Sequence, residues 1–303
     1  MRILIIRPGA LGDTLMLLPS LARIGRLAEI TLVAREPGLE YLRPHVPRAM
    51  DYERTGWHRL FMDDPLSSST LPFSDIDLAV AFLSDREGNV AERLQVSMPR
   101  ASIHVFPGFP NSDESIHTAF YLAKCLALSG CPLDPKKALE DALQHPLLGE
   151  DPFPKSPGRI VFHLGSGGIT KNHPTDFWMT LLQAFKYRFS ADHNPFVILL
   201  GPAEEIYLSF YQQQLNDDRE KIIFSPEKEP LTRLLQRAPL YIGHDSGITH
   251  LAAMLGTPTI ALFRNSRVDQ WRPLGPRVKV IEEKESSLTL IDQVCKAARE
   301  FIG

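Results

Sequence analysis

Three short segments carry side chains whose types and spacing suit chemistry on hydroxyl and phosphate groups. The first is residues 7–13, Arg-Pro-Gly-Ala-Leu-Gly-Asp, where Gly9 and Gly12 precede the carboxylate of Asp13. A carboxylate at the start of a helix can accept a proton from a substrate hydroxyl. The same position also suits a helix cap, which stabilises a helix by about 0.5–2 kcal/mol. Asp13 is therefore a candidate general base, with a purely structural cap as the alternative.

The second segment is residues 163–171, His-Leu-Gly-Ser-Gly-Gly-Ile-Thr-Lys. The backbone N–H groups of such a loop, around Ser166 and Gly167, can surround phosphate oxygens. Lys171 adds a point charge for the same anion. The spacing differs from that of a Walker A loop, so a P-loop nucleotide site is not predicted. A flexible connection is the alternative interpretation.

The third segment is residues 243–250, Gly-His-Asp-Ser-Gly-Ile-Thr-His. A helix that begins near Gly247 presents an N-terminus whose dipole favours a negative group. Asp245 lies at the end of the preceding apolar run, where it can bind sugar hydroxyls. His250 is four residues after Ser246 and so projects from the same helix face. The alternative is a capped helix with a buried histidine.

Further acids and an arginine are weaker candidates. Glu205 follows Gly201 by four residues and can bind a ribose diol, or it is an ordinary first-turn acid. Asp75 and Asp77 form an Asp-x-Asp pair that enters an apolar run, which favours a polar strand edge over a metal site. Arg35 follows the second apolar run and suits bidentate binding of an anion. We predict no metal site and no cofactor, because the histidines also lack the spacing of metal ligands.

These segments lie between apolar runs that alternate with helical patterns. Short continuous apolar runs predict buried strands, here over 2–7, 29–35, 75–83, 101–106, 159–164, 195–201, 221–225, 240–246, 259–263 and 278–282. Helices are predicted from Gly12 to about Arg26 and over 116–129, 174–189, 203–215, 230–237, 247–256 and 286–302. Alternating strands and helices predict an α/β fold with parallel sheets.

A proline-rich segment divides the chain. Residues 131–158 contain six prolines and no long periodic pattern, which favours a domain boundary. We therefore expect domains over residues 1–150 and 151–303, each Rossmann-like, with a cleft between them. Ligands of such sheets bind at the carboxyl ends of the strands, and each of the three segments follows a predicted strand.

Composition narrows the class of protein. The chain has 303 residues, 44% hydrophobic residues and a net charge of −3, which argues against nucleic acid as the main partner. The apolar N-terminus is interrupted by Arg7 and Asp13, so a buried strand is expected there rather than a signal peptide. No apolar run is long enough for a membrane span. The three cysteines do not suggest a disulfide framework, and a cytoplasmic location is expected. Cys125 and Cys295 lie in helical patterns and are expected in the core.

Taken in order, the segments resemble the heptosyltransferase family, glycosyltransferase family 9. The resemblance rests on RILIIRPGALGDTLMLLPSL, HLGSGGITKNHPTDFW, GPAEE, YIGHDSGITHLAAMLGTPTIALF and WRPLG, which together span nearly the whole chain. It implies a GT-B fold, with the acceptor bound mainly by the N-terminal domain and the nucleotide sugar by the C-terminal domain. It also implies an inverting, metal-independent transfer of a heptose-like sugar from an ADP-linked donor. In similar folds the last helix crosses back onto the N-terminal domain, and the sequence leaves this open here.

The resemblance also implies roles for individual residues. Asp13 would be the catalytic base, Lys171 would contact the phosphates and Glu205 the ribose, while Asp245 would engage the donor sugar. The residues expected around the diphosphate are Ser246, Gly247 and His250, and Ser166 and Gly167 belong to the same donor site by their loop. Gly12 and Arg35 are expected on the acceptor side. The acceptor would be a lipopolysaccharide-type, lipid-linked or other saccharide, reached by peripheral contact with the inner face of the membrane.

Two departures from the family pattern leave the donor open. Arg264-Asn265-Ser266 replaces a segment that usually resembles Gly-Pro-Thr, and His173 stands where a tryptophan is common. A GT-B transferase that uses another nucleotide sugar is therefore one alternative. The other is a non-catalytic protein that binds a nucleotide sugar.

Overall fold

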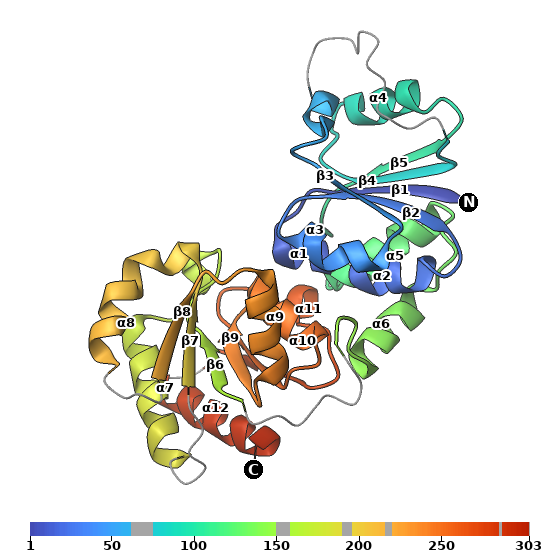
Figure 1. Cartoon of the computed structure of the whole chain (residues 1–303). Helices are drawn as coiled ribbons and strands as arrows, with labels where there is room; N and C mark the ends of the chain where they lie inside the picture. The colour runs from blue at the N-terminus through green and yellow to red at the C-terminus, as the bar shows by residue number, and fades with distance from the viewer. Residues whose placement is uncertain (62–74, 150–157, 190–195, 216–219, 285–286, 303) are drawn as a thin grey trace. The chain divides into compact units, whose positions relative to one another are not determined.

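The computed structural model describes residues 1–302 except 62–74, 150–157, 190–195, 216–219 and 285–286. The chain divides into two compact units, Met1–Asp141 and Ala142–Gly303. The boundary predicted between residues 150 and 151 lies outside the described residues. Each unit is an α/β unit built on one parallel sheet (Figure 1).

The first unit is built on a sheet in the order β3-β2-β1-β4-β5. The strands are β1 (Arg2–Arg7), β2 (Glu29–Ala34), β3 (Arg48–Asp51), β4 (Leu78–Phe82) and β5 (Ser102–Phe106). All neighbouring strands pair in parallel, with Ile3 of β1 opposite both Ile30 and Leu78. The central strand β1 is buried from Ile3 to Arg7, as expected for a strand covered on both faces.

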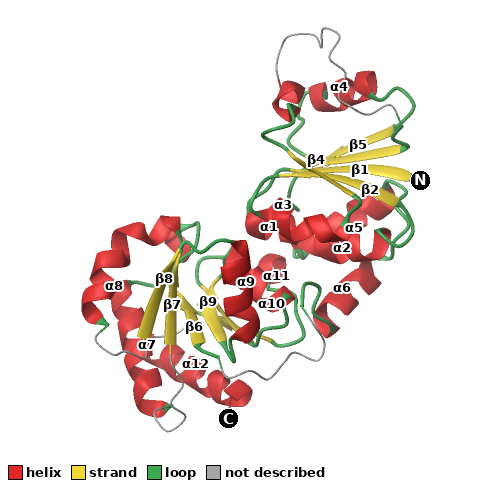
Figure 2. Cartoon of the chain, in the orientation of Figure 1, coloured by secondary structure: helices red, strands yellow, loops and turns green. Residues whose placement is uncertain are grey.

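Helices cover both faces of this sheet (Figure 2). Their bounds are α1 (Leu11–Leu15), α2 (Leu18–Ile24), α3 (Gly38–Leu42), α4 (Asn89–Ser97), α5 (Thr118–Leu128) and α6 (Pro135–Gln144), with 3₁₀ turns at Arg43–His45 and Trp57–Phe61. Helix α4 lies on one face, and α1, α2, α3 and α5 lie on the other.

One sequence prediction for the first unit is wrong, and helix α6 is absent from the predictions. The single helix expected up to Arg26 is two helices, α1 and α2. Pro19 has no N–H to donate to the Leu15 carbonyl, so the first helix cannot continue through it. The proline-rich segment from residue 131 contains a helix, α6, which begins at Pro135 and buries Ala138 and Ala142, and the division between the two units falls within this helix. Buried alanines give only a weak apolar periodicity, so the sequence of this segment does not predict a helix.

The second unit has a sheet in the order β11-β10-β9-β6-β7-β8. The strands are β6 (Ile160–His163), β7 (Phe196–Leu200), β8 (Glu220–Phe224), β9 (Tyr241–His244), β10 (Thr259–Phe263) and β11 (Val278–Glu282). All pairs are parallel. This is the Rossmann strand order. Successive strands are added on one side of β6 up to β8 and on its other side from β9 onward, so the switch point lies between β6 and β9. Ligands of such sheets bind outside the carboxyl ends of the strands at the switch point.

Helices cover both faces of this sheet as well (Figure 2). They are α7 (Thr175–Arg188), α8 (Leu208–Gln214), α9 (Lys228–Arg237), α10 (Gly247–Met254), α11 (Val268–Trp271) and α12 (Ser287–Ile302), with 3₁₀ turns at Ile169–Lys171 and Pro202–Tyr207. The helix predicted over 203–215 is thus divided into a 3₁₀ turn and α8. The terminal helix α12 packs on α7, β10 and β11, so it belongs to the second unit.

The core of the second unit is rich in aromatic side chains. Trp178 of α7 is fully buried, with its ring edge-on to Phe177 at 5.6 Å and to His244 at 5.1 Å between ring centroids. We expect Trp178→Ala to lower the free energy of unfolding by about 3–5 kcal/mol, because it opens a cavity that the packed core cannot close. Urea unfolding monitored by circular dichroism measures this. Trp178→Phe, which leaves a smaller void, should lose less, and equal losses for the two variants would contradict the packing argument.

The positions of the cysteines test the sequence predictions for the core. Cys125, Cys131 and Cys295 are free thiols and buried, which confirms the core positions expected for Cys125 and Cys295. Burial raises the pKa of each thiol, to about 12 for Cys131.

In the part of the chain that the structure describes, no helix is long and apolar enough to cross a membrane.

Candidate functional site

Asp13 lies at the carboxyl end of the central strand of the first unit. It is the third residue of α1, and its Oδ2 accepts the backbone N–H of Ala10 at 3.1 Å. A Cβ at Gly9 would lie 2.5 Å from the Cβ of Asp13, so only glycine allows this close approach. Both sequence interpretations of Asp13 therefore fit its place, since it caps α1 and also presents a half-buried carboxylate beyond β1.

Arg7 fixes the loop that carries Asp13. Its side chain is buried, and it donates from Nη1 to the Gly108 carbonyl at 2.5 Å and from Nε to the Asp13 carbonyl at 3.2 Å. The guanidinium also lies 4.8 Å from the ring centroid of Phe109. Burial lowers the pKa of Arg7 to about 10, against the opposing charges of Asp13 and Tyr121. Arg7 is thus a structural cation beside the proposed base, and the sequence pattern alone does not indicate this role.

The two residues predicted on the acceptor side lie in different settings. Gly12 is half-buried in the first turn of α1, directly before Asp13. Arg35 follows β2 and is exposed, with its Nε 2.5 Å from Glu53 Oε1 and its guanidinium 5.2 Å from the ring centroid of Tyr52. The charge of Arg35 is therefore already balanced by a carboxylate in the same unit.

The Asp-x-Asp pair lies at the amino ends of the strands of the same sheet, opposite the end where Asp13 lies. Both aspartates precede β4, at its amino end. Asp77 Oδ2 accepts the Arg2 backbone N–H at 2.7 Å, and Asp75 forms an ion pair with the Arg2 side chain at 3.2 Å. These contacts agree with the prediction of a polar strand edge. Among the described residues, no group of three or more His, Cys, Asp or Glu side chains is placed to hold a metal ion.

In the second unit, Lys171 and Asp245 are brought together from loops 74 positions apart. Lys171 Nζ lies 2.6 Å from Asp245 Oδ2, and His250 Nε2 lies 3.7 Å from Asp245 Oδ1. Asp245 is only 4% exposed. Burial acts to raise the pKa of Asp245, but hydrogen bonds and charge from His250 and Lys171 outweigh it, so the net pKa is lowered. A charged carboxylate and an ammonium group thus lie together beyond β6 and β9.

The loop after β6 is organised by a buried serine. Ser166 Oγ lies 2.7 Å from Asn172 Oδ1 and accepts the Gly168 N–H at 3.3 Å. Around Gly167 there is open space, since no atom lies within 4 Å of a Cβ built there. The loop is therefore held at its base while its glycine-rich tip stays accessible.

Helix α10 begins beside this loop. Ser246 is its N-cap, and Ser246 Oγ accepts the Thr249 N–H at 3.3 Å and lies 3.3 Å from Nδ1 of His163. Gly247 is the first residue of the helix. The structure thus brings together residues predicted from separate segments of the second unit, namely Ser166, Lys171, Asp245, Ser246, Gly247 and His250, and it does so at the switch point of the sheet.

The loop after β7 contributes an acid that sequence reasoning missed. Glu205 is exposed, whereas its neighbour Glu204 is buried and accepts the Gly201 N–H at 2.8 Å. A Cβ at Gly165 would lie 1.9 Å from Glu204 Oε1, so Glu204 packs directly against the loop after β6. Burial raises the pKa of Glu204, against the hydrogen bond from Gly201. The Gly-Pro-Ala-Glu-Glu string holds both acids, and only the fold distinguishes them.

A buried histidine pair adjoins the site. His244 Nε2 accepts the backbone N–H of His173 at 2.9 Å, and the two rings stack with centroids 5.0 Å apart. His173 also stacks on Phe177 at 4.3 Å and lies 3.7 Å from Glu283. Burial lowers the pKa of His173 to about 4, with Glu283 opposing. His173 is therefore neutral near pH 7, and its ring packs between aromatic side chains as a tryptophan ring would.

Burial of His163 predicts a loss of stability in acid. Burial lowers the pKa of His163 from 6.5 to about 4. Between these values the unfolded chain binds a proton that the folded chain does not, so stability falls as the pH falls from about 6.5 to 4. A shift of this size corresponds to roughly 3 kcal/mol. His163→Gln should remove this part of the acid loss in urea titrations from pH 7 to pH 4.

The buried hydroxyl of Ser97, which does not titrate in this range and donates to the Arg93 carbonyl at 2.9 Å, provides the control for that titration. The variant Ser97→Ala should lower the unfolding free energy by the same amount at every pH. Parallel curves for wild type and His163→Gln would contradict the buried, neutral state of His163.

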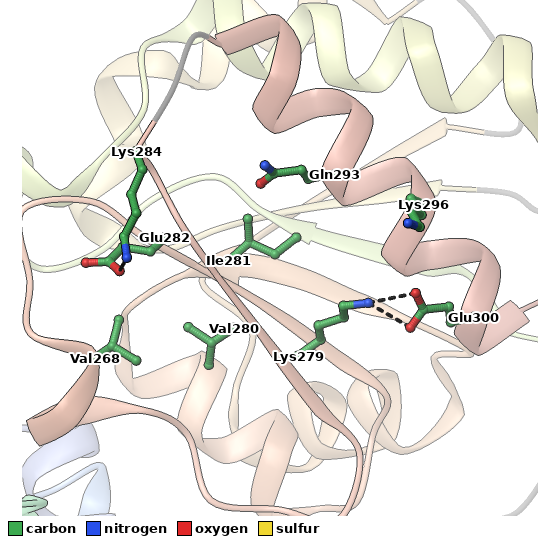
Figure 3. Close-up of a pocket in the computed structure, with 9 residues that line it drawn as sticks. All are labelled: Val268, Lys279, Val280, Ile281, Glu282, Lys284, Gln293, Lys296 and Glu300. Carbon is green, nitrogen blue, oxygen red and sulfur yellow. Dashed lines mark hydrogen bonds and ion pairs between the residues drawn. The ribbon is translucent and has the colours of Figure 1, made fainter.

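A groove elsewhere in the second unit lies along β11 and α12 (Figure 3). Two of its lysines form ion pairs, since Lys279 Nζ lies 2.7 Å from both carboxylate oxygens of Glu300 and Lys284 Nζ lies 2.8 Å from Glu282. The residues that line this groove include none of the predicted donor residues, which gather at the loops beyond β6 and β9.

Two Rossmann-type units, each built on one parallel sheet, place the protein in the class of GT-B folds, the fold of the solved structures that it matches. Within this class, the model of glycosyltransferase family 9 (heptosyltransferase) matches residues 108–299, more than half of the chain. The chain therefore belongs to glycosyltransferase family 9.

Solved structures of the same fold cover the chain over its whole length. The Escherichia coli ADP-heptose lipopolysaccharide heptosyltransferase II is 17% identical, with 100% of both chains covered and a TM-score of 0.70. The E. coli heptosyltransferase WaaC, solved with ADP, is 15% identical, with 98% of this chain and 100% of that chain covered and a TM-score of 0.68. A family 9 glycosyltransferase from Veillonella parvula is 16% identical, with 99% and 96% covered and a TM-score of 0.68. A search of curated proteins finds no match.

Proposed function

We propose that the protein transfers a heptose-like sugar from an ADP-linked donor to a lipopolysaccharide-type or other saccharide acceptor. The observation that carries the proposal is the contact between Lys171 and Asp245, at 2.6 Å, beside the N-terminus of α10. One cation, one carboxylate and one helix terminus lie together there, which suits a ligand with both phosphates and hydroxyls. Membership of family 9 supports the activity, and the WaaC structure with ADP supports the base of the nucleotide.

In this proposal the second unit binds the donor. Lys171 contacts the diphosphate, together with the first turn of α10 and the open glycine-rich tip after β6. Asp245 binds hydroxyls of the donor sugar, and Glu205 binds the ribose from the loop after β7. The remaining donor residues are Ser166, Gly167, Ser246, Gly247 and His250.

The first unit supplies the base and binds the acceptor, with Gly12 and Arg35 on the acceptor side. Asp13 takes the proton of an acceptor hydroxyl as its oxygen attacks the anomeric carbon. The bond from that carbon to the diphosphate breaks on the opposite face, so the configuration inverts. Lys171 and the dipole of α10 stabilise the charge that grows on the departing diphosphate. This charge stabilisation by side chain and backbone supports transfer without a metal ion. The proposed location is cytoplasmic, with peripheral contact at the inner face of the membrane.

The donor class is tested by thermal unfolding with ADP, UDP, GDP, CMP and NAD at matched concentrations. A ligand that binds only the folded state stabilises it by about 2.7 kcal/mol at a hundredfold excess over Kd. We expect ADP to raise the melting temperature most. A shift for UDP or GDP instead would retain a nucleotide-sugar transferase and replace the donor. The lack of a shift with every nucleotide would contradict the proposed donor site.

A further inference from the structure

The loop after β10 holds the backbone on both sides of Lys171. Arg264 Nη1 donates to the Asn172 carbonyl at 2.7 Å, and Asn265 Nδ2 donates to the Thr170 carbonyl at 2.9 Å. These are the two carbonyl groups that flank Lys171 in the sequence. Both lie at the end of the 3₁₀ turn Ile169–Lys171, where carbonyls have no partner within the turn.

The two donating side chains are themselves held in place. Arg264 Nε lies 2.8 Å from Glu283 Oε2, and Glu283 follows the edge strand β11. Asn265 has a φ of +52°, a left-handed conformation that asparagine tolerates better than most residues. The loop thus turns at Asn265 and presents its amide toward the turn that carries Lys171.

We propose that Arg264 and Asn265 act as a clamp that positions Lys171 for the donor diphosphate. This inference rests on the proposed function of the second unit and assigns a role to the segment in which the chain departs from the family pattern. Lys171 is a long, flexible side chain, and ordering it against an anion costs conformational entropy. The ion pair with Asp245, at 2.6 Å, orders the side chain, and the two hydrogen bonds to the flanking carbonyls fix the backbone from which it extends, so part of the entropy cost is met before the ligand arrives. Arg264 and Asn265 are positioning residues and act through Lys171.

The first test needs no ligand. The apoprotein is treated with a limiting amount of an amine acylating reagent, and the labelling of each lysine is quantified by peptide mass spectrometry. In Asn265→Gly, which keeps the left-handed backbone, we expect Lys171 to be labelled several-fold faster than in the wild type. Lys279, paired with Glu300 in the same unit, is the internal reference and should not change. An unchanged rate for Lys171 would overturn the clamp.

The second test is a double-mutant cycle on ADP affinity, measured by titration calorimetry. Asn265→Gly should weaken ADP binding about 2- to 10-fold, the range expected for one lost hydrogen bond. In a Lys171→Met background the same change should have no further effect, because the clamp acts only through Lys171. Equal effects in both backgrounds would overturn the proposal.

Further variants separate the clamp from folding and from donor identity. Asn265→Asp keeps the side-chain size, loses the donor and adds a negative charge, so it should weaken ADP binding at least as much as Asn265→Gly. Arg264→Lys should recover part of the affinity that Arg264→Met loses. If the wild type does not bind ADP, the proposed donor is wrong, and the labelling experiment still decides whether the clamp holds Lys171.

Discussion

Replacing Asp13 with asparagine is expected to lower kcat by about 10²–10⁴-fold, the usual contribution of a positioned general base. The asparagine oxygen can still accept the Ala10 N–H that Asp13 accepts at 3.1 Å. The change therefore removes the base while it keeps the cap of α1. Turnover is measured as nucleotide release in the presence of acceptor, and donor affinity by calorimetry. Donor affinity should stay near that of the wild type, since the proposed donor residues belong to the second unit. Asp13→Ala should abolish transfer as well.

A matched control separates catalysis from capping. Asp85 caps α4 in the same unit, where its two carboxylate oxygens accept the N–H groups of Val90 and Ala91 at 3.0 Å. Asp85→Asn leaves one of these two N–H groups without its acceptor, so it should lower the free energy of unfolding by about 0.5–2 kcal/mol and leave kcat unchanged. Near-normal turnover by Asp13→Asn, or an equal loss in both variants, would remove Asp13 as the base.

Replacing Lys171 with methionine is expected to lower kcat by about 10²–10³-fold, the effect of removing one group that stabilises charge in the transition state. Methionine keeps much of the length of the side chain and loses the ammonium group. The pKa of Asp245 should rise in this variant, because one of the two partners that hold it down is gone. Steady-state kinetics with a saturating acceptor measure the loss.

The pair formed by Lys186 and Glu220 provides the control for that prediction. It has the same form as the pair of Lys171 and Asp245, with a lysine 2.6 Å from a buried carboxylate in the same unit. It joins α7 to β8 and is not among the proposed donor residues. Lys186→Met should therefore reduce stability with little effect on kcat. A similar loss of kcat in both variants would show that Lys171 acts through stability alone.

Much of the fold could be predicted because buried parallel strands are continuous apolar runs. Ile3 to Ile6 and Phe196 to Leu200 are buried throughout, and no polar alternation obscures them. The short edge strand β3 was missed because Arg48 and Asp51 at its ends are polar. Helix α4 was missed because only Val90 and Leu94 supply a spaced apolar signal over its length.

The candidate site was predictable to the extent that it follows strands. The rule that parallel sheets bind ligands at their carboxyl ends identified the loops of Asp13, Lys171 and Asp245. Contacts made across the sequence could not be predicted, such as those of Arg264 with the Asn172 carbonyl and Glu283. They depend on which loops become neighbours in the folded sheet.

The most direct test of the proposed activity is one reaction with two readouts. The purified protein is mixed with ADP-heptose and a panel of saccharide acceptors that includes a lipopolysaccharide inner core, and ADP release and the anomeric configuration of the new linkage are followed. We expect equal amounts of ADP and of glycosylated acceptor, an inverted anomeric centre, and loss of both products in Asp13→Asn. The proposed transfer is contradicted if the wild type binds ADP but forms no glycosylated acceptor and releases no more ADP than Asp13→Asn does. That result would favour a non-catalytic binding protein.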